Sequence, residues 1–375
     1  MIFPYRCWVE VSRARIAENF RAVRNAAGPA IEVMPVVKAD AYRHGAAEVS
    51  RVLVAEGARW LAVGNVEEGV ALRQAGIGAR ILVMAGFLAT ERDALVEHNL
   101  TPVLHSVDDL AVWNALALRH GAPLPYHLKI DSGMGRLGTR AEAAEIARAV
   151  LANRAAVLEG LLTHFASAAD YGSPQTDAQI ARFERLRADL EQSGIRPRYV
   201  HMASSIPIAY GRRESLGNMV RPGHAIYGYV SPTRGTAPAP ILEVAPALEW
   251  KTQVLAVKEI PEGAPVGYGG MFRAPRPMRI AVLSAGYADG VPHRLSNRGH
   301  VIAAGIRAPI AGAVSMDLTT IDCTHCPALQ TGDPVTLLGS ENGVSIDAQQ
   351  IARLAGTISY SVLCGISARV KRLYV

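Results

Sequence analysis

The stretch VVKADAYRHG occupies residues 36–45 and follows an apolar run that begins at Ile31. A short apolar run predicts a buried strand, so Lys38 is expected to end one. A lysine that loses its water has a lowered pKa, and its neutral amine can form an imine with a carbonyl group. Tyr42 follows four residues later, and a helix-like segment begins after Gly45. Barrel and doubly wound enzymes present their catalytic groups between a strand and the helix that follows it. This order therefore favours Lys38 as a catalytic residue.

Lysine is rare in this chain. Lysine and arginine total 39, and only five of these are lysine, which leaves 39 − 5 = 34 arginines. The alternative interpretation of Lys38 is a strand-end lysine whose ammonium group extends into solvent. Because arginine supplies the charge elsewhere and cannot form an imine, the composition favours the catalytic interpretation.

Length and charge narrow the class of protein. A chain of 375 residues suits a barrel with a smaller second domain. The net charge of +6 is spread along the chain, which favours small anionic ligands over nucleic acid. The sequence has no apolar run of about 18 residues and no signal peptide at its start, so we expect a cytoplasmic protein without a membrane partner.

The cysteines do not predict a metal site. Cys323 and Cys326 flank His325 at a spacing seen in zinc sites. A tetrahedral zinc site needs a second pair of ligands, and none follows. Four cysteines in a chain of this length also make a poor disulfide framework. We therefore expect surface thiols and no metal.

The first 240 residues have the pattern of a barrel. A strand at Trp8–Val11 is followed by a helix with Ile16, Phe20 and Val23 on one face. After the Lys38 strand, about eight units of apolar strand and amphipathic helix predict a (β/α)8 TIM barrel rather than an open sheet. The expected strands are Trp60–Val63, Ile81–Met84, Thr101–Leu104, Tyr126–Asp131, Leu158–His164, Tyr199–Met202 and one near Met219 or at Ala225–Val230. The expected helices begin near Val66, Thr90, Val107 and Arg140, and a long one spans Pro174–Gln192.

A proline-rich linker at residues 231–240 separates this barrel domain (1–240) from a smaller, mainly β domain (241–375). Short strands with glycine turns replace the helical periods there. The expected strands are Leu248–Ile260, Met278–Leu283, His300–Ala303, Ala308–Ala311 and Asp333–Leu338, with one helix at Asp347–Ala355. The sequence thus predicts an α/β barrel followed by a second domain of a different class.

Polar groups follow several barrel strands. Residues 129–138 join Lys129 to a glycine-rich turn with Arg136, and His164 closes another strand. Residues 201–205 end in two hydroxyls, and Arg221-Pro222-Gly223 supplies a cation and a small backbone amide. Hydroxyls and amides in the last barrel loops are typical of a phosphate site. An imine lysine together with a phosphate site indicates either pyridoxal 5′-phosphate (PLP) or a phosphorylated sugar.

The second domain distinguishes these two possibilities. Polar or aromatic residues lie in turns at 266–270, 286–290, 315–317 and 359–364. With these clusters in this order, after VVKADAY, LKIDSGMGRLG, LTHF and RPG, the chain resembles the alanine racemases over essentially its whole length. That family combines PLP with a barrel and a β domain.

The resemblance implies a role for each matching residue. It implies that Lys38 carries PLP and that Arg221 faces the pyridine nitrogen. The phosphate would be held by Tyr42, Ser205, Tyr360 and the Gly223 region. Arg136 would bind the substrate carboxylate, with Tyr287 and Met316 bordering the substrate and Asp317 supporting them. Lys129 matches a lysine that the family often carries as a carbamate. Lys38 and Tyr268 would be the two bases, with Tyr268 supplied by the partner in a head-to-tail homodimer, and His164 would join Arg221 at the cofactor.

The chain departs from the family pattern at four positions. Arg43 replaces a glycine, Ser204 an asparagine, Ser315 a cysteine and His224 an apolar residue. None of these removes a catalytic group, but they leave the range of substrates open.

Racemisation requires a proton to leave one face of Cα and return on the other, so two bases are the economical arrangement. The implied function is interconversion of L- and D-alanine, supplying D-alanine for cell-wall peptidoglycan. A racemase of broader range, for example one acting on serine, is an alternative, as is a decarboxylase of the same fold, against which Arg221 argues. A non-catalytic PLP carrier would not need the second domain, and a Schiff-base aldolase would not need Tyr268.

Overall fold

The computed structural model describes residues 5–375 and divides the chain into two compact units. The barrel unit contains Arg15–Ala41 and Ala46–Ala245. The sheet unit contains the N-terminal segment through Ala14, Tyr42–Gly45 and Pro246–Val375. Each unit has its own core, and each is described separately below.

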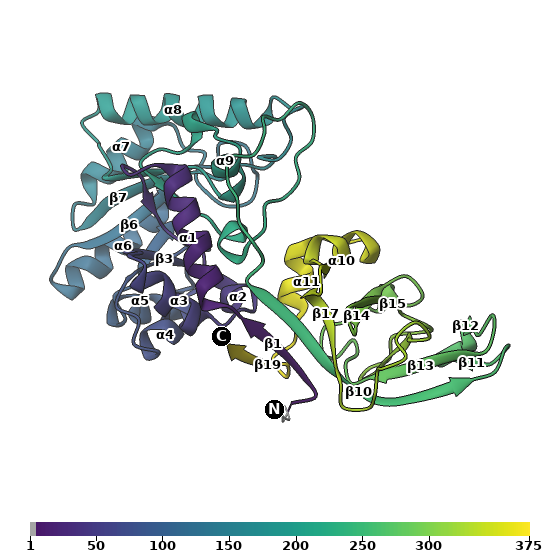
Figure 1. Cartoon of the computed structure of the whole chain (residues 1–375). Coiled ribbons are helices and arrows are strands. Elements are labelled where there is room, and N and C mark those ends of the chain that lie inside the picture. The colour runs from purple at the N-terminus through teal and green to yellow at the C-terminus, as the bar shows by residue number, and fades with distance from the viewer. Residues whose placement is uncertain (1–4) are drawn as a thin grey trace. The chain divides into compact units, whose positions relative to one another are not determined.

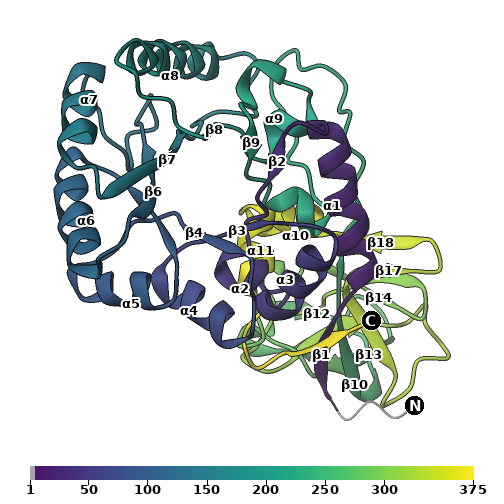
Figure 2. The same cartoon turned by 90° about the vertical axis from the view of Figure 1, so that its left-hand side faces the viewer.

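Eight strands form the barrel unit, and Figure 2 shows them as a ring with helices on its outside. Six of them make a parallel sheet in sequence order, and β2 pairs in parallel with β9. A bridge between Val36 and Ala62 joins the β2 segment to β3, and the amide of Asn218, just before β9, donates to the carbonyl oxygen of Val200 in β8 (3.0 Å). The strands are β2 (Glu32–Val33), β3 (Trp60–Val63), β4 (Arg80–Val83), β5 (Thr101–Leu104), β6 (Leu124–Lys129), β7 (Ala156–Leu162), β8 (Tyr199–His201) and β9 (Met219–Val220).

The barrel helices form where apolar residues recur at helical spacing. Helix α1 buries Ile16, Phe20 and Val23, and α6 begins at the capping box of Ser106 and ends at the left-handed Gly121. The helices are α1 (Arg13–Ala27), α2 (Lys38–Tyr42), α3 (Ala46–Ala55), α4 (Val66–Gln74), α5 (Arg92–Glu97), α6 (Val107–His120), α7 (Ala143–Ala152), α8 (Gln175–Gln192) and α9 (Ser205–Ala209), with 3-10 turns η1 (Ala89–Glu91), η2 (Arg213–Ser215) and η3 (His224–Tyr227). Within residues 5–375, no helix has both the length and the apolar character needed to span a membrane.

A nine-stranded sheet forms the core of the sheet unit, with β10 at its centre (Figure 1). Strand β10 pairs antiparallel with β1, β13 and β17, so the N-terminal strand belongs to this sheet. The strands are β1 (Cys7–Val11), β10 (Leu248–Ile260), β13 (Met278–Leu283), β14 (His300–Ala303), β15 (Ile306–Pro309), β16 (Thr319–Asp322), β17 (Pro334–Glu341), β18 (Val344–Ile346) and β19 (Lys371–Tyr374). A separate hairpin pairs β11 (Pro265–Val266) with β12 (Phe272–Arg273), and the helices are η4 (Tyr268–Gly270), η5 (His293–Leu295), α10 (Ala348–Ala355) and α11 (Ser359–Gly365).

The prediction of a barrel followed by a mainly β part is confirmed, with corrections in detail. The run from Ile31 to Val37 is not one continuous strand. Strand β2 covers Glu32–Val33, and beyond Pro35, which has no amide hydrogen to donate, the amides of Val36 and Val37 donate to Pro222 and Ala62. Of the two places expected for the last barrel strand, Met219 is in β9, whereas residues 225–230 contain the turn η3. Strands expected at Ala308–Ala311 and Tyr126–Asp131 both begin and end two residues earlier.

Two further expectations differ from the structure. Cys323 and Cys326 are buried (0% and 2% exposed) rather than surface thiols. The amide of Cys323 donates to Arg279 in β13, and the thiol of Cys326 donates to the carbonyl oxygen of Ala303 in β14. The expected boundary at residue 240 places the first strand in the barrel domain, whereas β1 lies between β10 and β19.

Candidate active site

The backbone after Val37 turns in the left-handed direction. Five consecutive non-glycine residues, Ala39 to Arg43, have φ between 52° and 66°. Left-handed helical backbone costs an L-residue roughly 1–2 kcal/mol because Cβ approaches the following carbonyl oxygen. The amide of Ala39 donates to Oε1 of Glu68 (2.7 Å), and the amide of Ala46 donates to Oδ1 of Asp40 (2.8 Å). These carboxylates satisfy backbone donors on both sides of the turn and help to hold a conformation that is unfavourable by itself.

Lys38 opens this turn and is exposed, which corrects the expectation of a buried strand-end lysine. Strand-type hydrogen bonds continue to Val37, whose amide donates to Ala62 (2.8 Å), and the left-handed turn begins at Ala39, so Lys38 lies just beyond the hydrogen-bonded segment. Lys38 lies over Gly64, where an added Cβ would come within 3.7 Å of the lysine Cβ. Lys38 is therefore accessible to a reacting carbonyl group.

The second lysine-bearing loop, residues 129–140, is organised by one carboxylate. Oδ1 of Asp131 accepts hydrogen bonds from the amides of Gly133, Met134 and Gly135 (2.9–3.1 Å), and Oδ2 accepts one from Nε of Arg140 (2.7 Å). Burial raises the pKa of Asp131, but these hydrogen bonds outweigh it and lower the pKa to about 2. The loop is thus fixed by a carboxylate that stays ionised.

Lys129 ends β6 and is buried, with 6% of its surface exposed. Burial is the main cause that lowers its pKa to about 8, and the charges of Arg136 and Arg221 lower it further. His164 has a pKa lowered to about 3, by burial first and then by Arg221, Lys129, Arg136 and Lys38. The structure therefore brings together four of the predicted cationic side chains around a neutral His164. This arrangement attracts anionic ligands.

Arg221 is buried in the barrel and is held by five acceptors. Nη1 donates to the carbonyl oxygen of His201 (2.7 Å) and contacts its Nδ1 (3.0 Å). Nη2 donates to the carbonyl oxygens of Thr163 (2.7 Å) and Met202 (3.1 Å) and contacts Nδ1 of His164 (3.4 Å). These contacts all use the terminal nitrogens, and within the described residues Nε has no hydrogen-bond partner. Arg221 therefore keeps one N–H available for a ligand acceptor.

Ser205 and Gly223 lie together after β8 and β9. The Ser205 hydroxyl is buried and accepts hydrogen bonds from the amides of Gly223 and Ala225 (3.1 Å each). A hydroxyl and backbone amides in the last loops of a barrel make a typical phosphate site. The structure confirms that these residues are neighbours; their role remains a proposal.

In the sheet unit, the rings of Tyr42 and Tyr360 lie 6.0 Å apart, centroid to centroid. Burial raises the pKa of the Tyr42 hydroxyl, so it stays protonated. The Tyr42 phenol can therefore act as a hydrogen-bond donor.

Two loops of the sheet unit are joined by backbone hydrogen bonds. The amide of Tyr287 donates to Ser315 (3.0 Å), and the amide of Ala288 donates to Met316 (2.9 Å). Arg369 donates two hydrogen bonds to the buried Asp289 (2.7 and 2.9 Å). Tyr287 and Met316 thereby share one exposed surface (46% and 54% exposed).

Asp317 belongs to the same arrangement, because it accepts a hydrogen bond from Nη2 of Arg369 (2.7 Å). Its expected supporting function has this ion pair as its structural basis. Sequence reasoning missed Arg369, which lies 80 residues from its Asp289 partner.

Tyr268 lies at the tip of the β11–β12 hairpin and is 77% exposed. Its neighbours Gly267, Gly269 and Gly270 all have positive φ, which places the tyrosine on a tight turn. Gly267 also passes close to backbone, since a Cβ there would lie 3.3 Å from the amide nitrogen of Ala313. The tip presents its phenol outward.

The residues that depart from the family pattern have local structural roles. Arg43 is left-handed (φ 66°), and its Nε donates to the carbonyl oxygen of Cys364 (3.4 Å). The Ser315 hydroxyl bonds to the backbone of Leu318, and His224 stacks on Tyr229 (5.1 Å between centroids). Ser204 precedes α9 and has no side-chain cap bond there.

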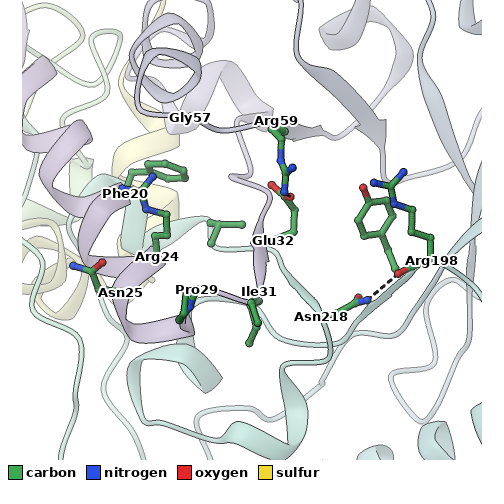
Figure 3. Close-up of a pocket in the computed structure, with 13 residues that line it drawn as sticks. Phe20, Arg24, Asn25, Pro29, Ile31, Glu32, Gly57, Arg59, Arg198 and Asn218 are labelled. Atoms are coloured by element: carbon green, nitrogen blue, oxygen red, sulfur yellow. Dashed lines mark hydrogen bonds and ion pairs between the residues drawn. The ribbon is translucent and has the colours of Figure 1, made fainter.

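A cavity of about 680 Å³ opens at the other end of the barrel (Figure 3). Its lining includes Glu32 and Tyr199, each the first residue of its strand, with Arg59 and Asn218 just before other strands. None of the predicted site residues lines it. Because barrel enzymes place their chemistry at the carboxyl ends of the strands, we do not assign the reaction to this cavity. Within the described range, no three histidine, cysteine or acidic side chains gather as a metal site.

Sequence reasoning missed a buried polar group inside the barrel. His127 on β6 and His201 on β8 contact each other at 2.8 Å, and Glu159 on β7 forms an ion pair with Arg80. The sequence signal was a set of polar residues within strands, at positions where a barrel core is normally apolar.

Comparisons with known proteins agree with this geometry. The N-terminal domain of alanine racemase matches residues 11–232, and its C-terminal domain matches residues 247–374. The alanine racemase of Carboxydothermus hydrogenoformans is 40% identical, with 98% of this chain and 99% of that protein covered.

Solved structures give the same result. The alanine racemase of Streptomyces lavendulae has a TM-score of 0.92 and 31% identity, with 100% of this chain and 98% of that one covered. That of Bartonella henselae, which contains covalently bound pyridoxal phosphate, has a TM-score of 0.87 and 29% identity over 99% of this chain and 100% of the other. From the domain matches, the identity and the shared fold, the chain belongs to the alanine racemase family.

Proposed function

We propose that this protein interconverts L- and D-alanine with PLP bound to Lys38. The observation that carries the proposal is the group of cations at the carboxyl ends of the barrel strands. Lys38, Lys129, Arg136 and Arg221 all act on His164 electrostatically. A phosphorylated cofactor and an amino-acid carboxylate are the anions that this group would bind.

The residues present fit PLP. Arg221 offers Nε–H, which suits an unprotonated ring nitrogen because guanidinium can only donate. The amides of Gly223 and Ala225 both donate to the Ser205 hydroxyl oxygen, which leaves the Ser205 O–H as a donor for a phosphate. As the resemblance implies, Tyr42 and Tyr360 would also bind the phosphate, and His164 would complete the cofactor site next to Arg221.

When bound, PLP supplies an electron-accepting ring that makes the Cα proton of an amino acid easier to remove. Arg136 would hold the substrate carboxylate, and Tyr287 and Met316 would border the side chain, with Asp317 fixing their loop through Arg369. Lys38 would take or return a proton on one face of Cα. Tyr268 of the partner subunit would do so on the other face.

Arg221 also supports racemisation over decarboxylation. Because it donates and does not release its proton readily, Arg221 would leave the ring nitrogen of bound PLP unprotonated and the ring a weaker electron acceptor. Burial lowers the pKa of Arg221 to about 10, which still leaves the guanidinium charged near neutral pH.

Lys129 fits the carbamate that the resemblance implies. With its pKa lowered to about 8, a fraction of the amine is neutral near physiological pH. A neutral amine is the form that adds carbon dioxide. The resulting negative charge would be next to Arg136 and would orient it.

The proposal includes a head-to-tail homodimer in the cytoplasm that supplies D-alanine for peptidoglycan. The exposed Tyr268 on a hairpin tip supports a shared site. Mixing dissociated Lys38→Ala and Tyr268→Ala subunits tests it, because random pairing makes about half of the dimers mixed, each with one intact site. About a quarter of wild-type activity should return. No return, with subunit exchange verified, would exclude the shared site.

A chiral assay with L-alanine in deuterated water tests the reaction itself. The expected result is D-alanine that carries deuterium at Cα and approaches the amount of the L-enantiomer. Serine tested in parallel measures the substrate range. Loss of the carboxyl group as carbon dioxide, with no D-alanine formed, would instead identify a decarboxylase.

A further inference from the structure

The buried polar group inside the barrel forms a continuous series of contacts, which we name the imidazole relay: Arg221, His201, His127 and Glu159. Nη1 of Arg221 contacts Nδ1 of His201 (3.0 Å), and Nε2 of His201 contacts Nδ1 of His127 (2.8 Å). Nε2 of His127 lies 3.8 Å from Oε2 of Glu159. The last contact is an electrostatic one, longer than an ordinary hydrogen bond.

The direction of these contacts follows from Arg221, which can only donate. Nδ1 of His201 must therefore accept, so the proton of this neutral ring is on Nε2. That Nε2–H donates to Nδ1 of His127, which places the proton of His127 on Nε2 as well. The series thus ends in an N–H that needs an acceptor, and Glu159 provides a carboxylate at that end.

Glu159 can serve as this acceptor because Arg80 keeps it ionised and oriented. The two guanidinium nitrogens of Arg80 donate to its two oxygens (2.6 and 2.7 Å). Burial raises the pKa of Glu159, but the contacts with His127 and Arg80 lower it to about 2. Burial and Arg221 together lower the pKa of His201 well below its usual range, so this ring stays neutral.

The surrounding barrel is shaped to hold His127. The ring is fully buried and lies 5.3 Å from the ring of Trp60 and 6.0 Å from that of Tyr199. Gly160 of β7 makes the necessary room, because a Cβ there would be 2.3 Å from Nδ1 of His127. Burying a polar ring and placing a glycine within a strand both reduce the stability of the fold. We therefore infer that the buried position of His127 serves a function.

We propose that Glu159 and Arg80, acting through His127 and His201, are positioning residues that fix the orientation of Arg221 and aim its Nε–H at the cofactor ring. This inference rests on the proposed PLP function. Arg80 and Glu159 touch neither cofactor nor substrate in this proposal. Without the terminal acceptor, the imidazole rings can exchange tautomers, and the hydrogen bond from Nη1 of Arg221 is lost part of the time.

The first test is a nitrogen NMR measurement of histidine tautomers on ¹⁵N-histidine-labelled protein, with signals assigned by substitution of His127 and of His201. The wild-type protein should show both rings neutral with the proton on Nε2. Glu159→Gln should introduce a second tautomer or exchange broadening at His127. Glu56→Gln is the matched control, because Glu56 also accepts two hydrogen bonds from an arginine but lies on the surface. A proton on Nδ1 of either ring in the wild type would overturn the proposal.

The second test is the dissociation of PLP, followed by its visible absorbance after dilution. We expect Glu159→Gln to raise the dissociation rate about tenfold, the effect of removing the carboxylate charge that faces the buried Nε2–H of His127. His127→Phe keeps an aromatic ring and removes the acceptor, and should have the same effect if Glu159→Gln does not fold. If the PLP dissociation rates of Glu159→Gln and His127→Phe were both within about twofold of the rate of Glu56→Gln, the proposal would be contradicted. Because the NMR result does not require PLP, it separates failure of the relay from failure of the cofactor assignment.

Discussion

The two lysine-bearing loops of the barrel differ in the conformation of their backbone and in the burial of their lysine. The turn after Lys38 has five consecutive left-handed residues and not one glycine among them, and its lysine is exposed. The loop after Lys129 has glycines at 133, 135 and 138 with positive φ, and its lysine is buried. The first loop carries backbone strain next to an accessible amine, whereas the second is relaxed around Asp131. Strain is concentrated where we propose the covalent chemistry, as is common at functional sites.

The largest expected effect separates the two lysines. Lys38→Ala should lower racemisation by more than about 10³-fold, because it removes both the cofactor attachment and one base. Borohydride reduction of the wild type followed by peptide mapping should place the pyridoxyl group on Lys38. A pyridoxyl group on Lys129 would show that the cofactor is attached to the second loop and not to Lys38.

The second prediction concerns the relaxed loop. Asp131→Ala should destabilise the fold by about 2–4 kcal/mol, since three backbone amides lose their acceptor in a partly buried site. Urea denaturation at neutral pH measures this. In the wild type, the contribution of Asp131 is complete above its ordinary pKa near 3.8 and is lost as the pH falls towards 2, because its folded-state pKa is the lower one. Asp40→Ala in the other loop, with its single hydrogen bond to Ala46, is the matched comparison and should cost less.

Lys129 gives a prediction in which the charged form destabilises the fold, whereas the charged form of Asp131 stabilises it. Its folded-state pKa of about 8 is below the ordinary value of 10.5, so folding releases a proton between pH 8 and 10.5, and burial of the charged form costs stability below pH 8. This cost, about 1–3 kcal/mol, should disappear as the pH rises from 8 to 10.5. Lys129→Met, which removes the titrating group, should therefore be more stable than the wild type at pH 7 and lose that advantage at pH 10. Thermal unfolding in carbonate-free buffer measures it, and a constant difference across this range would contradict the pKa.

The smallest expected effect tests the strain directly. Arg43→Gly should stabilise the protein by about 0.5–1 kcal/mol, because glycine adopts a φ of 66° without the Cβ contact. Loss of the long hydrogen bond to Cys364 offsets part of this gain. Gly138→Ala is the reciprocal control, since its φ is 117° and its Cβ would lie 2.8 Å from the amide nitrogen of Asp131. Equal changes in melting temperature for both variants would show that the two loops do not differ in strain.

Much of the fold and of the site could be predicted from local pattern. Strands Trp60–Val63, Thr101–Leu104, Leu248–Ile260, Met278–Leu283 and His300–Ala303 have the expected bounds, because an apolar period and its flanking turns are local properties. Lys38, Lys129, His164 and Arg221 were found at strand ends because parallel strands bring their carboxyl ends to one face.

The rest of the fold and of the site depended on contacts between residues far apart in the sequence. The sequence by itself determined two units, their order, and the family motifs, since each is a local run of residue types. Only the tertiary structure decided that Lys38 is exposed and Lys129 buried, because burial depends on which distant residues pack around each lysine. It also decided that Gly160 makes room for His127 and that Glu159 ends a series of contacts from Arg221. Hydrogen bonds and burial are pairwise properties of residues in space, and a single sequence does not state which distant residues meet.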